Sequence, residues 1–209
     1  MRLKNIKNAD EKIKESKYLV INPEQNKGNW NKIFDNNNPI YVEIGMGKGN
    51  FIIGMALKYP NINFVGIEMY NSVILRAIQK LEELEIPNLR LISINAMTID
   101  DIFKNEIDRI YLNFSDPWPK DRHYKRRLTN YVFLEKYDKI FKDKKEIFQK
   151  TDNINLFNFS LESLSKYGYE LRNVTNDLYS ENVEDNVQTE YEEKFVAKNI
   201  RINRLEAYK

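Results

Sequence analysis

The stretch IYVEIGMGKG, residues 40–49, decides the fold that we predict for this chain. Its first part, from Ile40 to Gly45, is apolar enough for a buried strand, and Gly47 and Gly49 follow at alternate positions. Glycine permits positive φ and lets a ligand approach the backbone, and a helix that starts at Asn50 would offer free N–H groups. A tight strand-to-helix turn uses the same glycines without any ligand, so the turn alone leaves both interpretations open. Its G-x-G-x-G spacing also differs from the G-x-G-x-x-G of dinucleotide-binding proteins.

Apolar runs alternate with amphipathic segments downstream of this turn. The predicted strands cover residues 40–45, 62–68, 89–94, 109–114 and 146–149, and the predicted helices cover 50–59, 71–85, 129–141 and 153–167. Two closing strands are expected at 169–174 and 193–198, with no helix between them. Strands that alternate with helices form a parallel sheet covered on both faces. We therefore predict an α/β fold in three layers, with a mostly parallel sheet and an antiparallel pair at one edge.

The first 39 residues differ in composition from the rest of the chain. They are rich in Asn and Lys and are interrupted by Pro23, Gly28 and Pro39. We predict a loosely structured basic arm over residues 1–39 and one domain over residues 40–209. A length of 209 residues suits a single domain with an extension.

The composition excludes several kinds of chemistry. Cysteine is absent and His123 is the one histidine, which excludes thiol nucleophiles, iron–sulfur clusters and multi-histidine metal sites. We expect no metal. The formal net charge of +2 says nothing about a nucleic-acid partner, which must be argued from where the charges lie. Because no membrane span and no secretory signal are evident, we expect a cytoplasmic protein without a membrane partner.

Two glutamates near the glycine turn suggest what the turn binds. Glu68 ends the second predicted strand, 68 − 45 = 23 residues after Gly45, where an acidic side chain can accept hydrogen bonds from ribose hydroxyls. A solvated strand end explains it equally well. Glu43 lies inside an apolar strand, where a carboxylate is costly unless it finds a partner such as an ammonium group. S-adenosylmethionine carries a ribose and an ammonium group but no pyrophosphate, which suits the shorter glycine loop.

The segment NFSDPWPKDRHYKRR, residues 113–127, has the densest chemistry. Asp116 follows the fourth predicted strand, and Pro117 and Pro119 stiffen the chain around Trp118. Residues 120–127 then contain five basic residues and one acidic residue. Basic and aromatic side chains in one run suit phosphate contact and base stacking. A solvated surface loop is the alternative, but the neighbouring rigid corner favours contact with nucleic acid.

Two later segments are candidates for the same edge of the sheet. Thr151, Asp152 and Asn153 follow the fifth predicted strand, and their alternative role is to cap the next helix. Residues 189–193, TEYEE, precede the last predicted strand, where acidic residues also serve to guard an edge.

Taken together, these motifs resemble one known family. EIGMGKG, GIEMY, YLNFSDPWPKDRHYKRRL, KTDN and TEYEEKF, in this order, resemble the bacterial tRNA (guanine-N7)-methyltransferases over residues 40–198. The resemblance implies a class I methyltransferase (Rossmann-like) fold with a seven-stranded sheet, S-adenosylmethionine as cofactor and tRNA as partner. It also implies methylation of a guanine at position 46, in the variable loop of the tRNA, to 7-methylguanosine.

The resemblance also assigns roles to individual residues. It implies cofactor contacts for Glu43, Gly45, Gly47, Glu68, Asn95 and Asp116. It implies a substrate pocket formed by Lys120, Asp152, Thr189, Glu190, Tyr191 and Glu192. It implies RNA contacts for Arg122, His123, Tyr124, Lys125, Arg126 and Arg127. Many relatives carry Asp where this chain has Asn95, although an amide can still pair with an adenine edge.

The expected chemistry needs alignment and charge stabilisation more than proton transfer. Guanine N7 carries a free lone pair, and the base becomes cationic as the methyl group arrives, so a carboxylate beside it stabilises the product charge. Asp116 is our first candidate for this catalytic role and Asp152 the second. The alternatives are an amino-methyltransferase that acts on adenine or a protein amide, and a methyltransferase-like protein that only binds RNA. The oligomeric state, monomer or homodimer, stays open.

Overall fold

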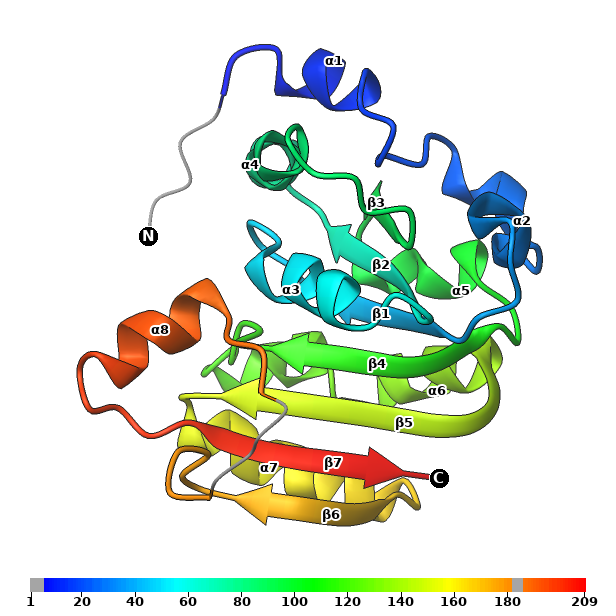
Figure 1. Cartoon of the computed structure of the whole chain (residues 1–209). Coiled ribbons are helices and arrows are strands. Elements are labelled where there is room, and N and C mark those ends of the chain that lie inside the picture. Colours follow the sequence, from blue (N-terminus) through cyan, green and yellow to red (C-terminus); the bar gives the residue numbers. More distant parts are fainter. Residues whose placement is uncertain (1–5, 182–185) are drawn as a thin grey trace.

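Seven strands of the computed structural model, which describes residues 6–181 and 186–209, form one sheet (Figure 1). They are β1 (Ile40–Ile44), β2 (Asn63–Glu68), β3 (Leu89–Ser93), β4 (Ile107–Asn113), β5 (Phe141–Thr151), β6 (Glu170–Thr175) and β7 (Asn203–Tyr208). Their order is β3-β2-β1-β4-β5-β7-β6. Strands β1 to β5 pair in parallel, and β7 runs antiparallel between β5 and β6. The predicted α/β fold with an antiparallel edge is confirmed.

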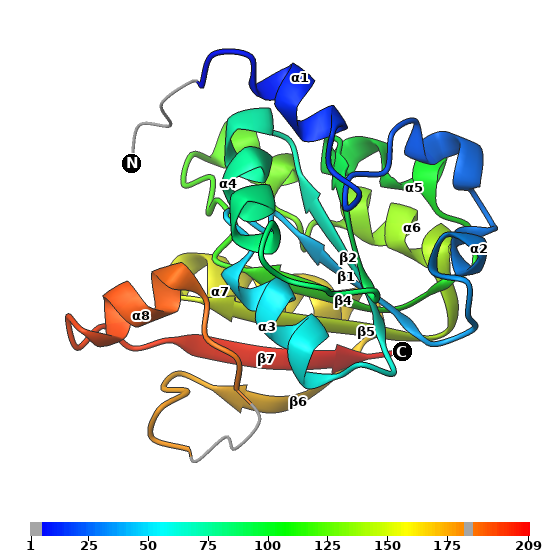
Figure 2. The same ribbon diagram turned by 45° about the horizontal axis from the view of Figure 1, so that its top comes forward.

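Helices cover both faces of the sheet, as Figure 2 shows. One face carries α3 (Asn50–Lys58) and α4 (Asn71–Leu81), and the other carries α5 (Ile99–Ile102), α6 (Tyr131–Ile140) and α7 (Ile154–Lys166). Alternation along β1 places Val42 and Ile44 in the apolar cluster under α5, α6 and α7. The intervening residues Tyr41 and Glu43 therefore face the side of α3. This geometry puts a carboxylate beneath the glycine turn.

The N-terminal segment is more ordered than we predicted. Residues 6–39 contain α1 (Ala9–Lys14), the 3-10 helix η1 (Pro23–Asn26) and α2 (Trp30–Phe34). Trp30 is fully buried, and its indole N–H donates to the carbonyl oxygen of Ile102 at 3.1 Å. The prediction of a loosely structured arm is wrong, because a few widely spaced apolar residues each find a place in the core. The domain boundary at residue 39 stays a prediction.

The predicted last strand, residues 193–198, is also wrong. Residues 193–196 belong to the helix α8 (Glu190–Val196), which lies between the two closing strands, where we predicted no helix, and the last strand is β7. Thr189 caps α8: its hydroxyl accepts from the Glu192 N–H at 2.9 Å, while the Glu192 carboxylate accepts from the Thr189 N–H at 3.3 Å. Residues 189–192 thus form a capping box and do not guard a sheet edge, which was the alternative to their predicted place in the substrate pocket. In Figure 1, α8 lies beyond the carboxyl ends of the parallel strands.

Candidate active site

The glycine turn between β1 and α3 is shaped by conformation at all three glycines and by packing at the third. Gly45, Gly47 and Gly49 have φ of +77°, +57° and +78°. A Cβ on Gly45 or Gly47 would meet no atom within 4 Å, whereas one on Gly49 would lie 3.0 Å from Ala77 Cβ. Gly45 and Gly47 therefore serve the turn and leave open space at its surface, where a ligand can approach the backbone.

Glu43, next to this turn, is a buried carboxylate with one oxygen free. It is 2% exposed, and its Oε1 accepts from Asn113 Nδ2 at 2.9 Å. Its Oε2 has no hydrogen-bond partner in the part of the chain that the structure describes. Burial raises the pKa of Glu43 to about 7, against the opposing effects of Asn113 and Lys150. A cationic group on a ligand would satisfy this oxygen and favour the ionised form.

Glu68, at the end of β2, is held in place by backbone donors. Its carboxylate accepts from the N–H groups of Gly47 at 3.2 Å, Met69 at 2.9 Å and Tyr70 at 3.1 Å. Burial raises the pKa of Glu68, and these three donors oppose the shift. The solvated strand end that we had weighed does not describe this residue, because its carboxylate is tied to the glycine turn. A carboxylate has room for about four hydrogen bonds, which leaves space for a hydroxyl donor.

Asn95 begins the short 3-10 helix η2 (Ala96–Thr98) that follows β3. Its Oδ1 accepts from the Met97 N–H at 2.9 Å, while its Nδ2 makes no hydrogen bond to any residue in the described ranges. Met69 and Met97, which follow Glu68 and Asn95, expose large apolar side chains at the ends of these neighbouring strands. The sequence reasoning missed both methionines, although each comes within two residues of a polar strand end.

The Asp-Pro-Trp-Pro corner after β4 has an unusual backbone. Phe114 and Trp118 have φ of +50° and +43°, in the left-handed region that costs a non-glycine residue roughly 1–3 kcal/mol. Arg127 holds the corner: its Nε donates to the Pro117 carbonyl and its terminal nitrogen to the Trp118 carbonyl, each at 3.1 Å. Asp116 is exposed between the two strained residues. Arg127 therefore holds the backbone of the corner in place, and the Asp116 carboxylate stays exposed to solvent.

The basic run 120–127 divides into exposed residues and residues that support the corner. Arg122, Tyr124 and Lys125 are exposed on the 3-10 helix η3 (Asp121–Arg126). The Arg126 guanidinium lies 4.7 Å from the centre of the Trp118 ring, although its side chain is still exposed. The His123 ring packs edge-on to the same ring at 5.8 Å. Arg127 directs two of its donors to the carbonyls of this corner, and its contact with RNA stays a prediction.

Helix α8 brings the predicted substrate residues to the same edge but uses most of them internally. Thr189 and Glu192 are buried, and Glu190 pairs with Lys48 of the glycine turn at 2.8 Å. Lys194 and Lys48 lower the pKa of Glu190 to about 2. Tyr191 is 51% exposed and stacks on Phe114, with ring centres 6.3 Å apart. Tyr191 is the member of this group with the most surface to offer a substrate.

Two further substrate candidates are exposed: Lys120, at the N-cap of η3, and Asp152, directly after β5. The helix-cap role that we had weighed for this segment belongs to Asn153, whose Oδ1 accepts from the Leu156 N–H at 2.9 Å. Asp152 is left to face a shallow groove shared with Asn199 and Arg201. The capping of α7 and the exposure of Asp152 are therefore compatible.

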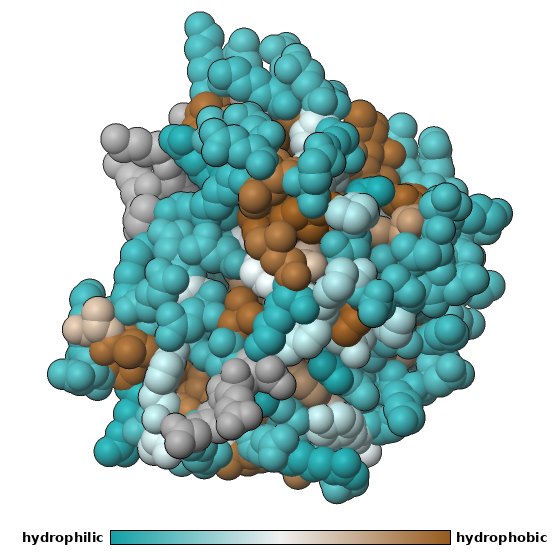
Figure 3. Space-filling view, viewed as in Figure 1, coloured by the Kyte–Doolittle hydropathy of each residue, from teal (hydrophilic) through white to brown (hydrophobic). Residues whose placement is uncertain are grey.

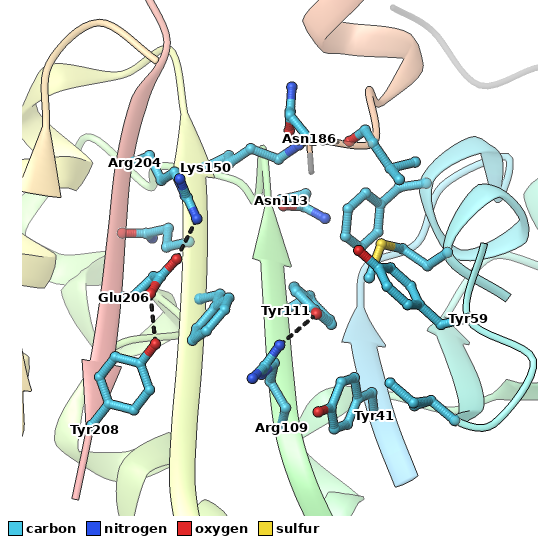
Figure 4. Close-up of a pocket in the computed structure, with 16 residues that line it drawn as sticks. Tyr41, Tyr59, Arg109, Tyr111, Asn113, Lys150, Asn186, Arg204, Glu206 and Tyr208 are labelled. Carbon is cyan, nitrogen blue, oxygen red and sulfur yellow. Dashed lines mark hydrogen bonds and ion pairs between the residues drawn. The ribbon is translucent and has the colours of Figure 1, made fainter. Parts of the chain in front are cut away.

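A separate cavity of about 390 Å³ opens on the α3 face of the sheet, beside the ends of β4 and β5 (Figure 4). The Arg109 guanidinium lies on its floor, 4.1 Å from the centre of the Phe148 ring, and pairs with Glu146 at 2.5 Å. Its upper end reaches Asn113 and Lys150, the neighbours of Glu43. Figure 3 shows the outer surface of this side as largely hydrophilic, with apolar side chains gathered near α3 and α4.

Comparison with known proteins identifies the family. A family profile described as "Putative methyltransferase" matches residues 37–205. A tRNA (guanine-N(7)-)-methyltransferase of Lachnoclostridium phytofermentans is 54% identical over 211 residues, which cover 100% of this chain and 99% of the relative. The chain belongs to the tRNA (guanine-N(7)-)-methyltransferase family. The protein of that name from Bacillus licheniformis is 51% identical, over 99% of this chain and 98% of its own length.

Solved structures support the fold of this family member at much lower identity. An antibiotic-related methyltransferase has a TM-score of 0.62 at 17% identity and covers 91% of this chain and 94% of its own. The 16S rRNA methyltransferase KamB has a TM-score of 0.64 at 10% identity, over 87% of this chain and 91% of its own. The class I methyltransferase fold implied by the sequence motifs is confirmed.

Proposed function

We propose that this chain transfers a methyl group from S-adenosylmethionine to N7 of a guanine in tRNA and so forms 7-methylguanosine. The observation that carries the proposal is its 54% identity, over its whole length, to a protein named for this activity. Supporting it, the fold gathers Glu43, Glu68, Asn95, Asp116 and Asp152 at the carboxyl ends of β1 to β5. In open α/β sheets, ligands bind at this edge.

The residues at the glycine turn fit the cofactor. The free Oε2 of Glu43 would bind its ammonium group, and the open backbone at Gly45 and Gly47 would contact its amino-acid part. Glu68 would accept from the ribose hydroxyls, and the unused Nδ2 of Asn95 would donate to the adenine edge. S-adenosylmethionine, when bound, supplies an electrophilic methyl group. Met69 and Met97 offer apolar surface beside the ribose and adenine positions.

The Asp-Pro-Trp-Pro corner suits the methyl acceptor. N7 of guanine attacks through its own lone pair, so no residue has to remove a proton. The Asp116 carboxylate would accept from the N1–H and N2–H₂ edge of the base and stabilise the positive charge that develops on it. Tyr191, stacked on Phe114, would offer an aromatic surface to the base plane. Lys120 and Asp152 would complete this substrate pocket.

The exposed part of the basic run would hold the tRNA backbone. Arg122, Lys125 and Arg126 are exposed and carry a local positive charge, whereas Arg127 acts on the corner. Methylation at position 46, in the variable loop, is proposed here from the family resemblance alone.

No helix within the described ranges is long and apolar enough to cross a membrane.

The decisive experiment is transfer of a labelled methyl group onto total tRNA, followed by nucleoside analysis. We expect the label in 7-methylguanosine, and we expect tRNA made with 7-deazaguanine to accept none. Label in an adenosine or in protein would support an amino-methyltransferase instead. Binding of RNA without binding of S-adenosylmethionine would support the non-catalytic alternative.

A further inference from the structure

A buried ion pair joins the end of β5 to helix α8. Lys150 and Glu192 have side chains that are 8% and 0% exposed, and Lys150 Nζ lies 2.6 Å from Glu192 Oε2. The same ammonium group donates to the Val187 carbonyl at 2.9 Å and to Asn186 Oδ1 at 3.0 Å. Figure 4 shows Lys150 extending from β5 toward Asn186 at the top of the cavity. All three partners lie in or just before α8.

The Glu192 carboxylate has no capacity left for a substrate in this arrangement. Its Oε1 accepts from Tyr179 OH at 2.8 Å and from Asn186 Nδ2 at 2.6 Å. Its Oε2 accepts from Lys150 and from the Thr189 N–H. Four donors fill the usual hydrogen-bonding sites of a carboxylate. If Glu192 serves the substrate pocket, as the family resemblance implies, it does so by holding neighbouring residues in place and not by accepting a hydrogen bond from the substrate.

Stability alone does not explain such a pair. Burying two charges costs hydration free energy that is about as large as the free energy gained from their attraction. A protein with well-packed apolar side chains at the same positions is therefore often equally stable. What an ion pair does supply is a defined geometry, because an ammonium group with three fixed acceptors accepts little displacement. Burial lowers the pKa of Lys150 and Glu192 opposes this shift, as expected for a charge kept in place by its partner.

The position of α8 matters because this helix contacts both the glycine turn and the Asp-Pro-Trp-Pro corner, the two parts of the candidate active site. Glu190 of α8 pairs with Lys48 in the glycine turn. Tyr191 and Phe195 pack on Phe114, at ring distances of 6.3 and 5.8 Å, two residues before Asp116. A shift of α8 would therefore move the aromatic surface beside Asp116.

We propose that Lys150 is a positioning residue for methyl transfer, which fixes α8 through Glu192 and so holds Tyr191 against the loop that carries Asp116. In this role it acts through α8 and not by contact with the methyl donor or the guanine. This inference rests on the proposed function, because it assigns the pocket at Tyr191 to the tRNA base.

The test compares Lys150→Met with the apolar double variant Lys150→Met/Glu192→Met. The single variant leaves a buried carboxylate without its counter-ion, and we expect a lower Tm or failure to fold. The double variant removes both charges and should recover most of the lost Tm. If Lys150 positions α8, the double variant still shows a KM for tRNA at least tenfold higher. Its Kd for S-adenosylmethionine, measured at pH 8 so that loss of the Lys150 charge leaves Glu43 ionised, changes much less. Lys150→Arg keeps the positive charge, so its KM for tRNA should lie closer to that of wild type than the KM of the double variant does.

The matched control is Lys145→Met, on the same strand and in an ion pair with Asp138. We expect a lower Tm with an unchanged KM. A double variant with wild-type KM and kcat would overturn the proposal, because the ion pair would then be structural only. Deuterium uptake by residues 190–196 gives a readout without activity: faster exchange in the double variant supports positioning, and unchanged exchange contradicts it. If wild type itself methylates no tRNA, the proposed function fails, and the exchange result still decides whether Lys150 holds α8.

Discussion

Two buried carboxylates, Glu43 beneath the glycine turn and Glu192 in α8, differ in how their oxygens are used. Glu43 lies beneath the glycine turn with one oxygen unpartnered, while Glu192 in α8 accepts four hydrogen bonds from its own chain. Burial without partners is costly, so an unpartnered oxygen indicates a ligand, and a saturated carboxylate indicates a structural role. Under the proposed function, Glu43 can therefore accept a cationic group of the ligand, whereas Glu192 contacts only residues of its own chain.

A substitution of Asp116, in the Asp-Pro-Trp-Pro corner, should have the largest effect on activity. Asp116→Ala removes the carboxylate proposed to stabilise the cationic base, and we expect kcat to fall about 10²–10³-fold, as for loss of one preorganised electrostatic contact. Affinity for tRNA, measured by filter binding, should change less than twofold. Asp121→Ala, in the same exposed loop, is the control and should retain kcat. A large loss of tRNA affinity in Asp116→Ala would make this residue a binding rather than a catalytic group.

The second prediction concerns the charge on Glu43. Its pKa is raised to about 7, so the carboxylate ionises as the pH rises from 6 to 7.5, and affinity for S-adenosylmethionine should rise over this range. Glu43→Gln should bind the cofactor roughly ten- to hundredfold more weakly at pH 7.5, as for loss of a charge-assisted hydrogen bond. Titration calorimetry at several pH values should show a flat profile for this variant.

The same group has an opposite effect on stability. Because its folded-state pKa lies above its ordinary value of 4.5, the folded protein binds more protons than the unfolded chain between pH 4.5 and about 7. The contribution of Glu43 to the free energy of unfolding is therefore fully present below pH 4.5 and is lost as the pH rises to 7. Glu43→Gln should remove this part of the pH dependence in urea unfolding. An identical slope in both proteins would show that Glu43 is not the titrating group.

The third prediction separates conformation from ligand contact at the glycine turn. Gly45→Ala and Gly28→Ala place a Cβ in open space at nearly equal φ, +77° and +75°, so each should cost about 1–2 kcal/mol of stability. Thermal unfolding should give similar decreases in Tm for the two variants. Affinity for S-adenosylmethionine should fall about tenfold or more in Gly45→Ala only. Equal cofactor affinity in both variants would place the ligand elsewhere.

The smallest effect distinguishes two neighbouring arginines. Arg122→Ala should weaken tRNA binding a few-fold and lower the slope of log K against log salt by about 0.7–0.9, as expected for one lost phosphate contact. Arg127→Ala should leave the slope unchanged and lower kcat, because its donors hold the Pro117 and Trp118 carbonyls. Filter binding at four salt concentrations measures both slopes. A reduced slope for Arg127→Ala would return this residue to the RNA-contact group.

Most of the fold was predictable because its signals are local. The strands β1 to β4 follow from the alternation of apolar runs, and their boundaries agree within two residues. Helix α3 agrees as well, but α4 ends at Leu81, four residues before the predicted end, and α5 was not predicted. Residues 193–198 were wrongly predicted as a strand, because the acidic residues before them also suit a sheet edge, and only the paired hydrogen bonds of Thr189 and Glu192 show that a helix begins there. The N-terminal helices were missed because Trp30 and Phe34 show no periodicity over so short a helix.

The sequence by itself determined the α/β class and the family, and it pointed to the residues that follow each strand; it predicted an antiparallel edge but placed one of its two strands ten residues too early. Parallel strands bring their carboxyl ends together whatever the intervening chain, so that convergence is a consequence of topology. Tertiary structure alone decided that Glu192 accepts four hydrogen bonds, that Arg127 donates to the corner and that Lys150 pairs with Glu192 of α8. These roles depend on contacts between residues distant in the chain, such as Lys150 with Glu192 and Phe114 with Tyr191. No local pattern encodes which distant partner a buried charge or ring will meet.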